Sequence, residues 1–224
     1  MSTLERITVI GAGHGGKAMA AHLAIKGFQV ALYNRTYEHI AMIERRGGIE
    51  LESYEGCERG FGKLALVTDK IQEALAFADV VMVVIPSSGH AEIARKAAPY
   101  FHDGQIVLLH PGRTCGAIEF HNEVHRSGLT TDITIAETET FIYASRSDGP
   151  AQARIFRVKE AVPLAALPAT RTQRVLDSIC PAYPQYVDGI NVLHTGLNNM
   201  GAIFHPALTI LNAGRIESTN GDFE

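Results

Sequence analysis

A glycine-rich turn near the N-terminus constrains the fold of this chain more than any other feature. A short apolar run, Ile7 to Ile10, leads directly into Gly11-Ala12-Gly13-His14-Gly15-Gly16. An alanine-rich helical pattern then spans Lys17 to Lys26, and a second apolar run spans Gln29 to Tyr33. Strand, glycine turn, helix and strand in this order predict a βαβ unit, which is the context in which a GxGxxG motif binds a dinucleotide.

Each glycine of the motif meets a separate steric demand. We expect Gly11 to permit the tight turn, Gly13 to let a pyrophosphate approach bare backbone, and Gly16 to let the helix lie close to the strand. The free N–H groups of the first helical turn then face the anion. Ala12, His14 and Gly15 complete the predicted cofactor loop. A plain glycine turn without a ligand is the alternative interpretation.

Composition narrows the class of protein. The 224 residues suffice for one large domain, or for one domain and part of another. No apolar run is long enough to span a bilayer and no export signal is evident, so we expect a cytoplasmic protein without a membrane partner. The net charge is −4 and the basic residues are dispersed, which does not favour nucleic acid as a partner. Three distant cysteines, Cys57, Cys115 and Cys180, indicate neither a disulfide framework nor a CxxC metal site.

Apolar runs alternate with helical patterns through residues 1–185, which we interpret as a dinucleotide-binding domain. Such alternation predicts an α/β fold with a doubly wound parallel sheet of Rossmann type. The expected strands are Ile7–Ile10, Gln29–Tyr33, Leu64–Val67, Val80–Ile85, Gln105–Leu109 and Thr134–Ala136, and the expected helices after the first are Tyr37–Arg46, Ile71–Phe77, Ala91–Phe101 and Ala117–Arg126.

Other segments fit this alternation less well. Glu50 to Lys63 reads as an irregular connection or a hairpin. Arg154–Lys159 and Ala161–Leu167 read as a short antiparallel excursion, and Thr170–Ile179 as a helix capped by Thr170. Residues 186–224 are predicted to begin a second, all-α domain, with one long helix from Asn191 to at least Asn212.

That long helix has two distinct faces. Leu193, Leu197, Met200 and Phe204 form an apolar stripe that we expect to pack, while Asn191, His194, Asn198 and His205 form a polar stripe without charge. Neutral side chains that donate and accept hydrogen bonds suit a binding cleft, although each could also satisfy buried backbone. Pro206 predicts a kink beside His205 that aims the imidazole into the cleft.

Two other histidine groups are candidates for a site. His121 and His125 lie one helical turn apart, but no third ligand is evident, so no metal site is predicted. His90 follows the fourth expected strand, where its loop would pass the nicotinamide ribose; capping of the next helix by Ser88 is the alternative.

Several motifs together resemble the opine dehydrogenase family. They are GAGHGG at Gly11 to Gly16, a strand end at Val84 to Pro86, His110-Pro111-Gly112, Ala136-Glu137-Thr138, and a block from Leu193-His194-Thr195 through Asn199 to His205-Pro206. The last block is the specific one. The resemblance implies that an amino acid and a 2-oxo acid condense to an imine, which a reduced nicotinamide cofactor converts to a secondary amine.

The resemblance also implies roles for single residues. His205 matches the catalytic histidine and would act as general acid and base. Asn199 matches a helix asparagine that would orient substrate or nicotinamide, and Asn198 is expected beside it on the substrate side. Glu137 and Thr138 are expected to bind substrate at the end of a strand, with helix capping as the alternative.

The sequence departs from the family pattern in two places. Family members continue into a helical domain that supplies an aspartate to the catalytic histidine, whereas this sequence stops at Glu224. Three interpretations account for the missing aspartate: the sequence is a fragment, a second chain completes the site, or the protein is a noncatalytic NADP-binding sensor. After the second strand, Asn34 and Arg35 stand where an NAD site usually has an acidic residue. Arginine there pairs with a 2′-phosphate, which favours NADP, with NAD possible.

The sequence also allows an alternative enzyme activity and predicts an oligomeric state. A related two-domain reductase acting on a 2-oxo or 2-hydroxy acid without an amine is the alternative enzyme. The apolar stripe of a helix without partner helices predicts self-association, most simply a homodimer.

Overall fold

The computed structural model describes residues 5–53, 58–198 and 200–221. Eight strands form the main sheet in the order β12-β11-β8-β7-β6-β1-β2-β5. Neighbours from β8 to β5 pair in parallel, whereas β11 is antiparallel to β8. The strands are β1 (Arg6–Ile10), β2 (Gln29–Tyr33), β5 (Leu66–Thr68), β6 (Val80–Val83), β7 (Ile106–Leu109), β8 (Thr134–Thr138), β11 (Val162–Leu167) and β12 (Tyr186–Asp188).

The register brings three strand ends to one edge of the sheet. Ile10 at the end of β1 pairs with Tyr33 of β2 and with Val83 of β6. Because the chain continues from β1 to one side and returns to the other side at β6, the strand order reverses beside β1. Ligands of open α/β sheets bind at such a reversal, outside the carboxyl ends of the strands.

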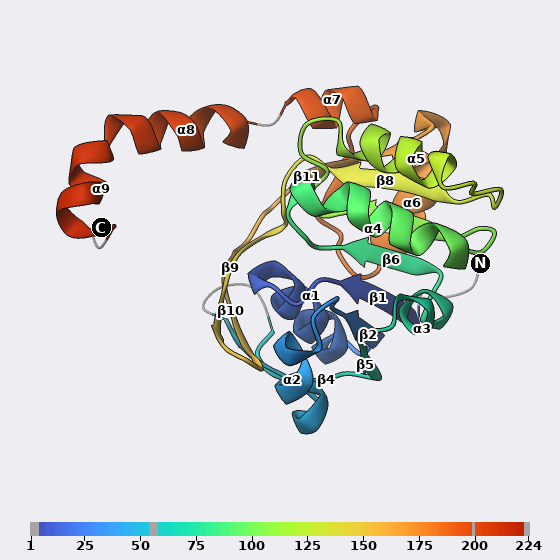
Figure 1. Cartoon of the computed structure of the whole chain (residues 1–224), viewed down its shortest axis with the longest axis horizontal. Coiled ribbons are helices and arrows are strands. Elements are labelled where there is room, and N and C mark those ends of the chain that lie inside the picture. Colours follow the sequence, from blue (N-terminus) through green and yellow to red (C-terminus); the bar gives the residue numbers. More distant parts are fainter. Residues whose placement is uncertain (1–4, 54–57, 199, 222–224) are drawn as a thin grey trace.

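Helices cover both faces of this sheet (Figure 1). α3 (Ile71–Phe77), α4 (His90–Ala97) and α5 (Gly116–Arg126) pack on one face, and α1 (His14–Ile25), α2 (Ala41–Arg46) and α6 (Thr172–Ile179) lie on the other. The fully apolar strands β6 and β7 are buried throughout, as strands covered on both faces should be. The doubly wound fold is confirmed.

A second sheet of four strands, β4-β3-β10-β9, packs over α1. Its strands are β3 (Gly48–Ser53), β4 (Gly60–Lys63), β9 (Tyr143–Gly149) and β10 (Gln152–Val158). The hairpin expected before residue 63 is confirmed as the antiparallel pair β3 and β4. The predicted antiparallel excursion after Arg146 is wrong, because its two segments enter different sheets: β10 pairs with β3 and β9, and β11 pairs with β8 and β12.

The helix near residue 170 begins later than predicted. A 3-10 turn covers Ala169–Arg171, and α6 follows without a side-chain cap. Thr170 therefore does not cap this helix. The Thr172 hydroxyl instead accepts a hydrogen bond from the backbone N–H of Ala166 in β11.

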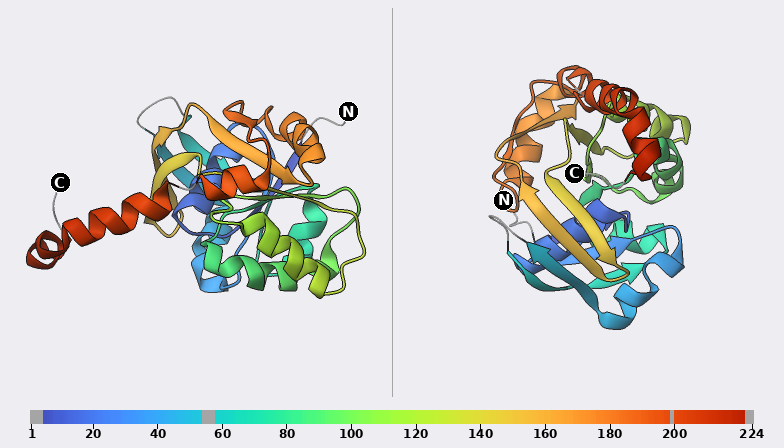
Figure 2. Two further views of the ribbon diagram at one scale, coloured as in Figure 1. Left: turned by 90° about the horizontal axis from the view of Figure 1, so that it is seen from above. Right: turned by 90° about the vertical axis from the view of Figure 1, so that its left-hand side faces the viewer.

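The long C-terminal helix of the prediction is three helices: α7 (Val192–Leu197), α8 (Gly201–Leu211) and α9 (Ala213–Thr219). The helix is interrupted between Leu197 and Gly201, where asparagine and glycine have low helix propensity. α8 continues through Pro206. The interruption therefore lies before Gly201, earlier in the chain than the kink expected beside His205. α8 and α9 contain no buried residue and project from the body (Figures 1 and 2). We call residues 201–221 the arm.

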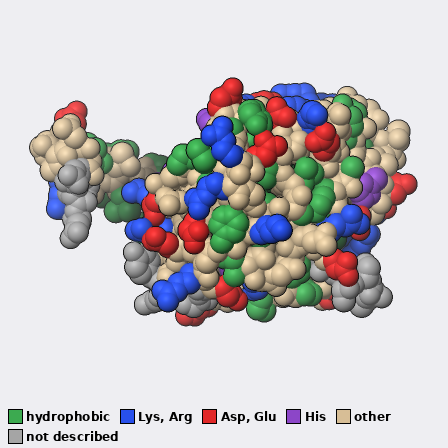
Figure 3. Space-filling view, turned by 90° about the horizontal axis from the view of Figure 1, so that it is seen from below, with side chains coloured by type: hydrophobic (Ala, Val, Ile, Leu, Met, Phe, Trp, Pro, Cys, Tyr) green, Lys and Arg blue, Asp and Glu red, His purple; other side chains and the backbone are tan. Residues whose placement is uncertain are grey.

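The predicted packing stripe is exposed. Leu197 is 70% and Phe204 55% exposed, whereas Val192, Thr195 and Gly196 form the face of α7 that packs on the body. Figure 3 shows hydrophobic side chains on the arm near the point where it leaves the body, and charges of both signs across this face of the body. Within the described ranges, no helix has the length and apolarity needed to cross a membrane.

Candidate functional site

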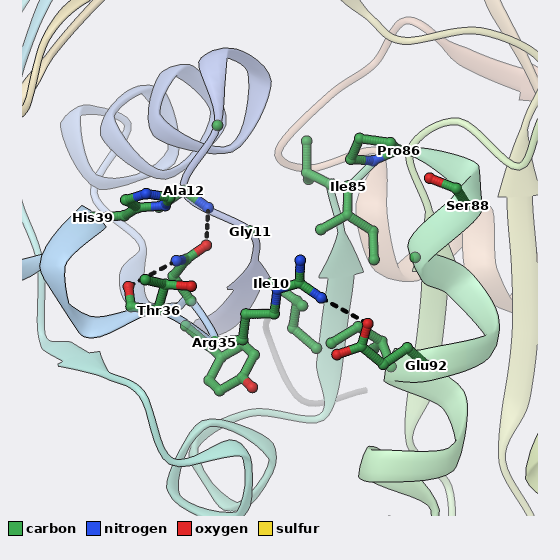
Figure 4. A pocket seen from close by; sticks show the side chains of 16 residues that line it. Ile10, Gly11, Ala12, Arg35, Thr36, His39, Ile85, Pro86, Ser88 and Glu92 are labelled. Carbon is green, nitrogen blue, oxygen red and sulfur yellow. Dashed lines mark hydrogen bonds and ion pairs between the residues drawn. The ribbon is translucent and has the colours of Figure 1, made fainter.

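A cavity of about 450 Å³ lies at the edge of the main sheet (Figure 4). We call it the first cavity. It lies outside the carboxyl ends of β1, β2 and β6, at the reversal of strand order. Sixteen residues line it: Ile10, Gly11, Ala12, Gly13, Tyr33, Asn34, Arg35, Thr36, His39, Val84, Ile85, Pro86, Ser88, Gly89, Glu92 and Ile93.

The glycine loop has the shape that a pyrophosphate requires. Gly11 has a φ of +109°, and a Cβ there would overlap the carbonyl of Val84. A Cβ at Gly16 would overlap the carbonyl of Gly11. A Cβ at Gly13 would meet nothing within 4 Å, so this backbone faces open space at the start of α1. The N–H groups of a first helical turn have no partner within the helix, so the start of α1 suits the binding of an anion.

Asn34 stands where an NAD site usually has an acidic residue, and its amide supports the glycine loop. Its Oδ1 accepts a hydrogen bond from the backbone N–H of Ala12 at 3.2 Å, and its Nδ2 donates to the carbonyl of Thr36 at 2.9 Å. The neighbouring Arg35 extends across the first cavity to α4, where Nη1 lies 2.6 Å from Oε2 of Glu92 (Figure 4). The predicted cofactor-binding residues Asn34, Arg35 and Pro86 all line this cavity.

His14 and Gly15 turn toward the second sheet. Nδ1 of His14 accepts a hydrogen bond from the backbone N–H of Ser147 at 2.8 Å, and a Cβ at Gly15 would meet the ring of Phe141. Lys17 donates from the same helical turn to the Ser147 hydroxyl and the Gly149 carbonyl, and burial lowers the pKa of its ammonium group. These contacts fix α1 against β9. A cofactor contact from His14 stays a prediction.

Two further cavities continue from the first. The second cavity, of about 540 Å³, shares Ser88 with the first and reaches the start of α5 at Gly116. The third cavity, of about 460 Å³, shares Arg113, Gly201 and His205 with the second. The three cavities therefore lie in a row from the glycine loop to the base of the arm.

His205 lies where the second and third cavities meet. Its side chain is exposed, and no hydrogen bond of its imidazole is found within the described ranges. Asn198 lines the third cavity, where its Nδ2 donates to Oε2 of Glu139 at 2.9 Å. The structure thus brings Asn198 and His205, two of the four residues of the predicted polar stripe, to one cavity, whereas Asn191 caps α7 with its side chain. Asn199 lies outside the described residues.

Glu137 is buried and both of its oxygens are engaged. Oε2 accepts from the backbone N–H of Ala117 at 2.7 Å, and Oε1 accepts from the hydroxyl of Thr195 at 2.8 Å. Burial raises the pKa of this carboxyl, and the two hydrogen bonds act in the opposite direction. Thr138 is also buried, and its hydroxyl donates to the carbonyl of Leu109. The geometry supports the capping alternative for Glu137, which joins the start of α5 to α7.

The Ser88 alternative for His90 is wrong, because α4 begins without a side-chain cap. His90 is instead buried beside Gly116, which lines the second cavity. Within the described part of the chain, no group of three or more histidine, cysteine, aspartate or glutamate side chains could hold a metal ion.

Sequence reasoning missed five charged residues at the cavities. Glu92 lies in the first cavity, Glu119 lies in the second, Arg113 lies between the second and third, and Glu139 and Lys159 lie in the third. The Lys159 ammonium donates to the Thr140 hydroxyl at 2.6 Å; burial, followed by the nearby charge of Arg113, lowers its pKa. Only Arg113 carried a signal in the sequence, since it follows His110-Pro111-Gly112 after a buried strand.

Comparison with known proteins decides the family. Residues 6–136 match the family described as the NAD-dependent glycerol-3-phosphate dehydrogenase N-terminus. The chain belongs to this family. Its first domain is therefore an NAD(P)-binding domain, and the first cavity with its glycine loop has the form that this cofactor requires.

The resemblance to opine dehydrogenases is also confirmed. The chain is 40% identical over 210 residues to an opine dehydrogenase of Arthrobacter sp. (strain 1C). The aligned region covers 94% of this chain and 58% of that protein. It therefore spans little more than half the length of this relative.

Solved structures show the same fold at lower identity. Octopine dehydrogenase with NADH and L-arginine has a TM-score of 0.77 at 16% identity, covering 97% of this chain and 56% of that one. Yersinopine dehydrogenase with NADP⁺ bound has a TM-score of 0.73 at 14% identity, covering 92% of this chain and 52% of that one.

Proposed function

We propose that this chain supplies the cofactor domain and the catalytic histidine of an NAD(P)-dependent oxidoreductase of opine dehydrogenase type. Such an enzyme reduces the imine formed from an amino acid and a 2-oxo acid to a secondary amine. One observation carries the proposal: the three cavities lie in a row, and His205 lies between the second and the third. A reaction that joins two substrates at a nicotinamide ring needs two adjacent subsites next to the cofactor.

The cofactor would supply the hydride, and the residues of this chain would bind, orient and transfer protons. His205 is the proposed general acid and base, because its imidazole lies at both substrate cavities. Arg113 and Lys159 offer positive charge to substrate carboxylates. Asn198 and Asn199 are proposed to bind substrate. Glu137 would act as a positioning residue by holding α5 and α7, and Thr138 by bonding the end of β7 at Leu109.

NADP is the proposed cofactor, with NAD as the second possibility. Arg35 lies in the first cavity after β2, where an arginine pairs with a 2′-phosphate.

The uncovered apolar residues of the arm favour a homodimer as the assembled form. A second, complementing chain bound to the arm is the alternative, and light scattering would distinguish it from a homodimer.

The reaction is tested by following NADPH oxidation with pyruvate alone, with an amino acid mixture alone, and with both. We expect oxidation only when both are present, with the secondary amine identified by mass spectrometry. Oxidation with pyruvate alone would support the alternative 2-oxo acid reductase. Cofactor binding without turnover on any pair would support the noncatalytic sensor, and failure to bind either reduced cofactor would reject the proposal.

His205→Gln tests the assigned catalytic residue. We expect kcat to fall about a hundredfold or more, as is usual when a general acid is lost. The Kd for NADPH should stay within about twofold of the original value, because His205 does not line the first cavity. An unchanged kcat would remove His205 from the mechanism.

A further inference from the structure

Glu92 reaches the first cavity from α4, on the side opposite the end of β2. Its carboxylate and the guanidinium of Arg35 form an ion pair with an N–O distance of 2.6 Å, drawn as a dashed line in Figure 4. Of the sixteen residues that line this cavity, Glu92 is the only carboxylate and Arg35 is the only one with a permanent positive charge. Among these lining residues, the permanent cation that a phosphate could bind is therefore already paired.

The two nicotinamide cofactors differ at one place in this region. NADP carries a 2′-phosphate with a charge near −2, where NAD carries a hydroxyl that donates a hydrogen bond. Related sites commonly discriminate with the side chain that follows the second strand. Here that position is the neutral Asn34, and both ends of its amide are engaged by Ala12 and Thr36. A carboxylate for the NAD ribose must come from another element.

We propose that Glu92 is the residue that sets the cofactor preference, by supplying from α4 the carboxylate that β2 lacks. A phosphate that pairs with Arg35 must displace this carboxylate or lie beside it, and either event lowers the affinity for NADP. A ribose hydroxyl can instead donate to the same carboxylate, which favours NAD. The protein therefore binds both cofactors, and Glu92 limits the advantage that Arg35 gives to NADP. This inference rests on the cofactor site of the proposed function.

The expected effect is moderate because the ion pair is open to solvent. The side chains of Arg35 and Glu92 are 63% and 51% exposed, so water and salt screen their interaction. Neutralising Glu92 should raise the affinity for NADPH by about tenfold at low ionic strength and by less at high salt. The affinity for NADH should stay the same or fall.

The test measures the Kd of NADPH and of NADH for the original protein and for Glu92→Gln by nicotinamide fluorescence. The control is Glu123→Gln on α5, which removes a carboxylate that pairs with Arg95 at 2.6 Å outside the first cavity. Glu92→Gln should change the NADPH to NADH affinity ratio by more than threefold, and Glu123→Gln should leave it unchanged. Adding Arg35→Met to Glu92→Gln should remove the gain, because no guanidinium is left to release.

The outcomes separate this inference from the function on which it rests. If the original protein binds neither reduced cofactor, the cofactor site itself is rejected. If it binds them and the ratio in Glu92→Gln stays within threefold of the original, only the role of Glu92 is rejected. A gain that persists after Arg35→Met would contradict the competition for Arg35.

Discussion

At the scale of single residues, two histidines are buried without the partners that a protonated imidazole needs. Both ring nitrogens of His90 lack a hydrogen-bond partner among the described residues. In His110, Nδ1 forms a hydrogen bond with the Tyr186 hydroxyl at 3.2 Å, and Nε2 lacks a partner among the same residues. Burial lowers the pKa of His90 to about 4 and that of His110 to about 3. Both side chains are therefore neutral at pH 7.

This burial predicts a loss of stability in mild acid. The ordinary histidine pKa of 6.5 lies above both folded values, so the unfolded chain takes up protons first as the pH falls. Each histidine should lower the free energy of unfolding by about 1 kcal/mol between pH 7 and pH 5.5. Glu137, whose pKa is raised, acts in the opposite direction. Urea unfolding at both pH values should show a smaller acid loss in His90→Leu, and an identical loss would contradict this.

Residues fixed by a local motif could be predicted, and residues fixed by distant packing could not. Gly11, Gly13 and Arg35 follow from their places after two strands. Glu92 meets Arg35 only because α4 and the end of β2 converge over the sheet, 57 residues apart in the chain. Lys159 and Arg113 come together in the same way, so no spacing in the sequence announces either pair.

At the scale of elements, a buried hydrogen bond joins α7 to the body, beside the packed face of Val192, Thr195 and Gly196. The Thr195 hydroxyl donates to Oε1 of Glu137, which also caps α5. Thr195→Val leaves this buried carboxylate oxygen without its partner, which should lower the free energy of unfolding by about 1–3 kcal/mol. Hydrogen exchange in α7 should become faster.

The control for that variant is Thr209→Val in α8. Its hydroxyl is exposed and donates to the His205 carbonyl within the same helix, so we expect an effect below about 0.5 kcal/mol. Equal effects of the two variants in urea unfolding would show that the bond to Glu137 does not hold α7.

Strands were predictable where the pattern is strong, although β6 ends at Val83, two residues before the predicted end at Ile85. The continuous apolar runs that became β1, β2, β6 and β7 need burial on both faces, so their sequence leaves few alternatives. The second sheet was missed because β3 pairs in parallel with β10, a pairing between distant segments that no local pattern encodes. The interruption before α8 was missed because helical periodicity continues through Asn198 and Gly201 even though the helix does not.

At the scale of the whole molecule, the body and the arm are nearly independent. α8 and α9 bury no residue, whereas their apolar side chains include Leu211, which is 81% exposed. The body should therefore fold and bind cofactor without the arm, and the arm should mediate association.

A chain ending at Asn198 tests this division. We expect its Kd for NADPH to stay within about twofold and its Tm to fall by no more than a few degrees, since α8 and α9 contain no buried residue. Light scattering should show the original protein as a dimer and the shortened one as a monomer. A complex with another protein that depends on the arm would point to a complementing chain. If the original protein stays monomeric at high concentration, the predicted homodimer is wrong.

The central claim, that a dinucleotide lies over the start of α1, is tested most directly by NADPH titration of Gly13→Ala. A Cβ at Gly13 meets nothing within 4 Å, so the variant should fold as well as the control Gly214→Ala, where a Cβ in α9 also has open space. The bound pyrophosphate would occupy that space, so NADPH affinity should fall about tenfold or more in Gly13→Ala alone. Equal affinity in the two variants would contradict the account.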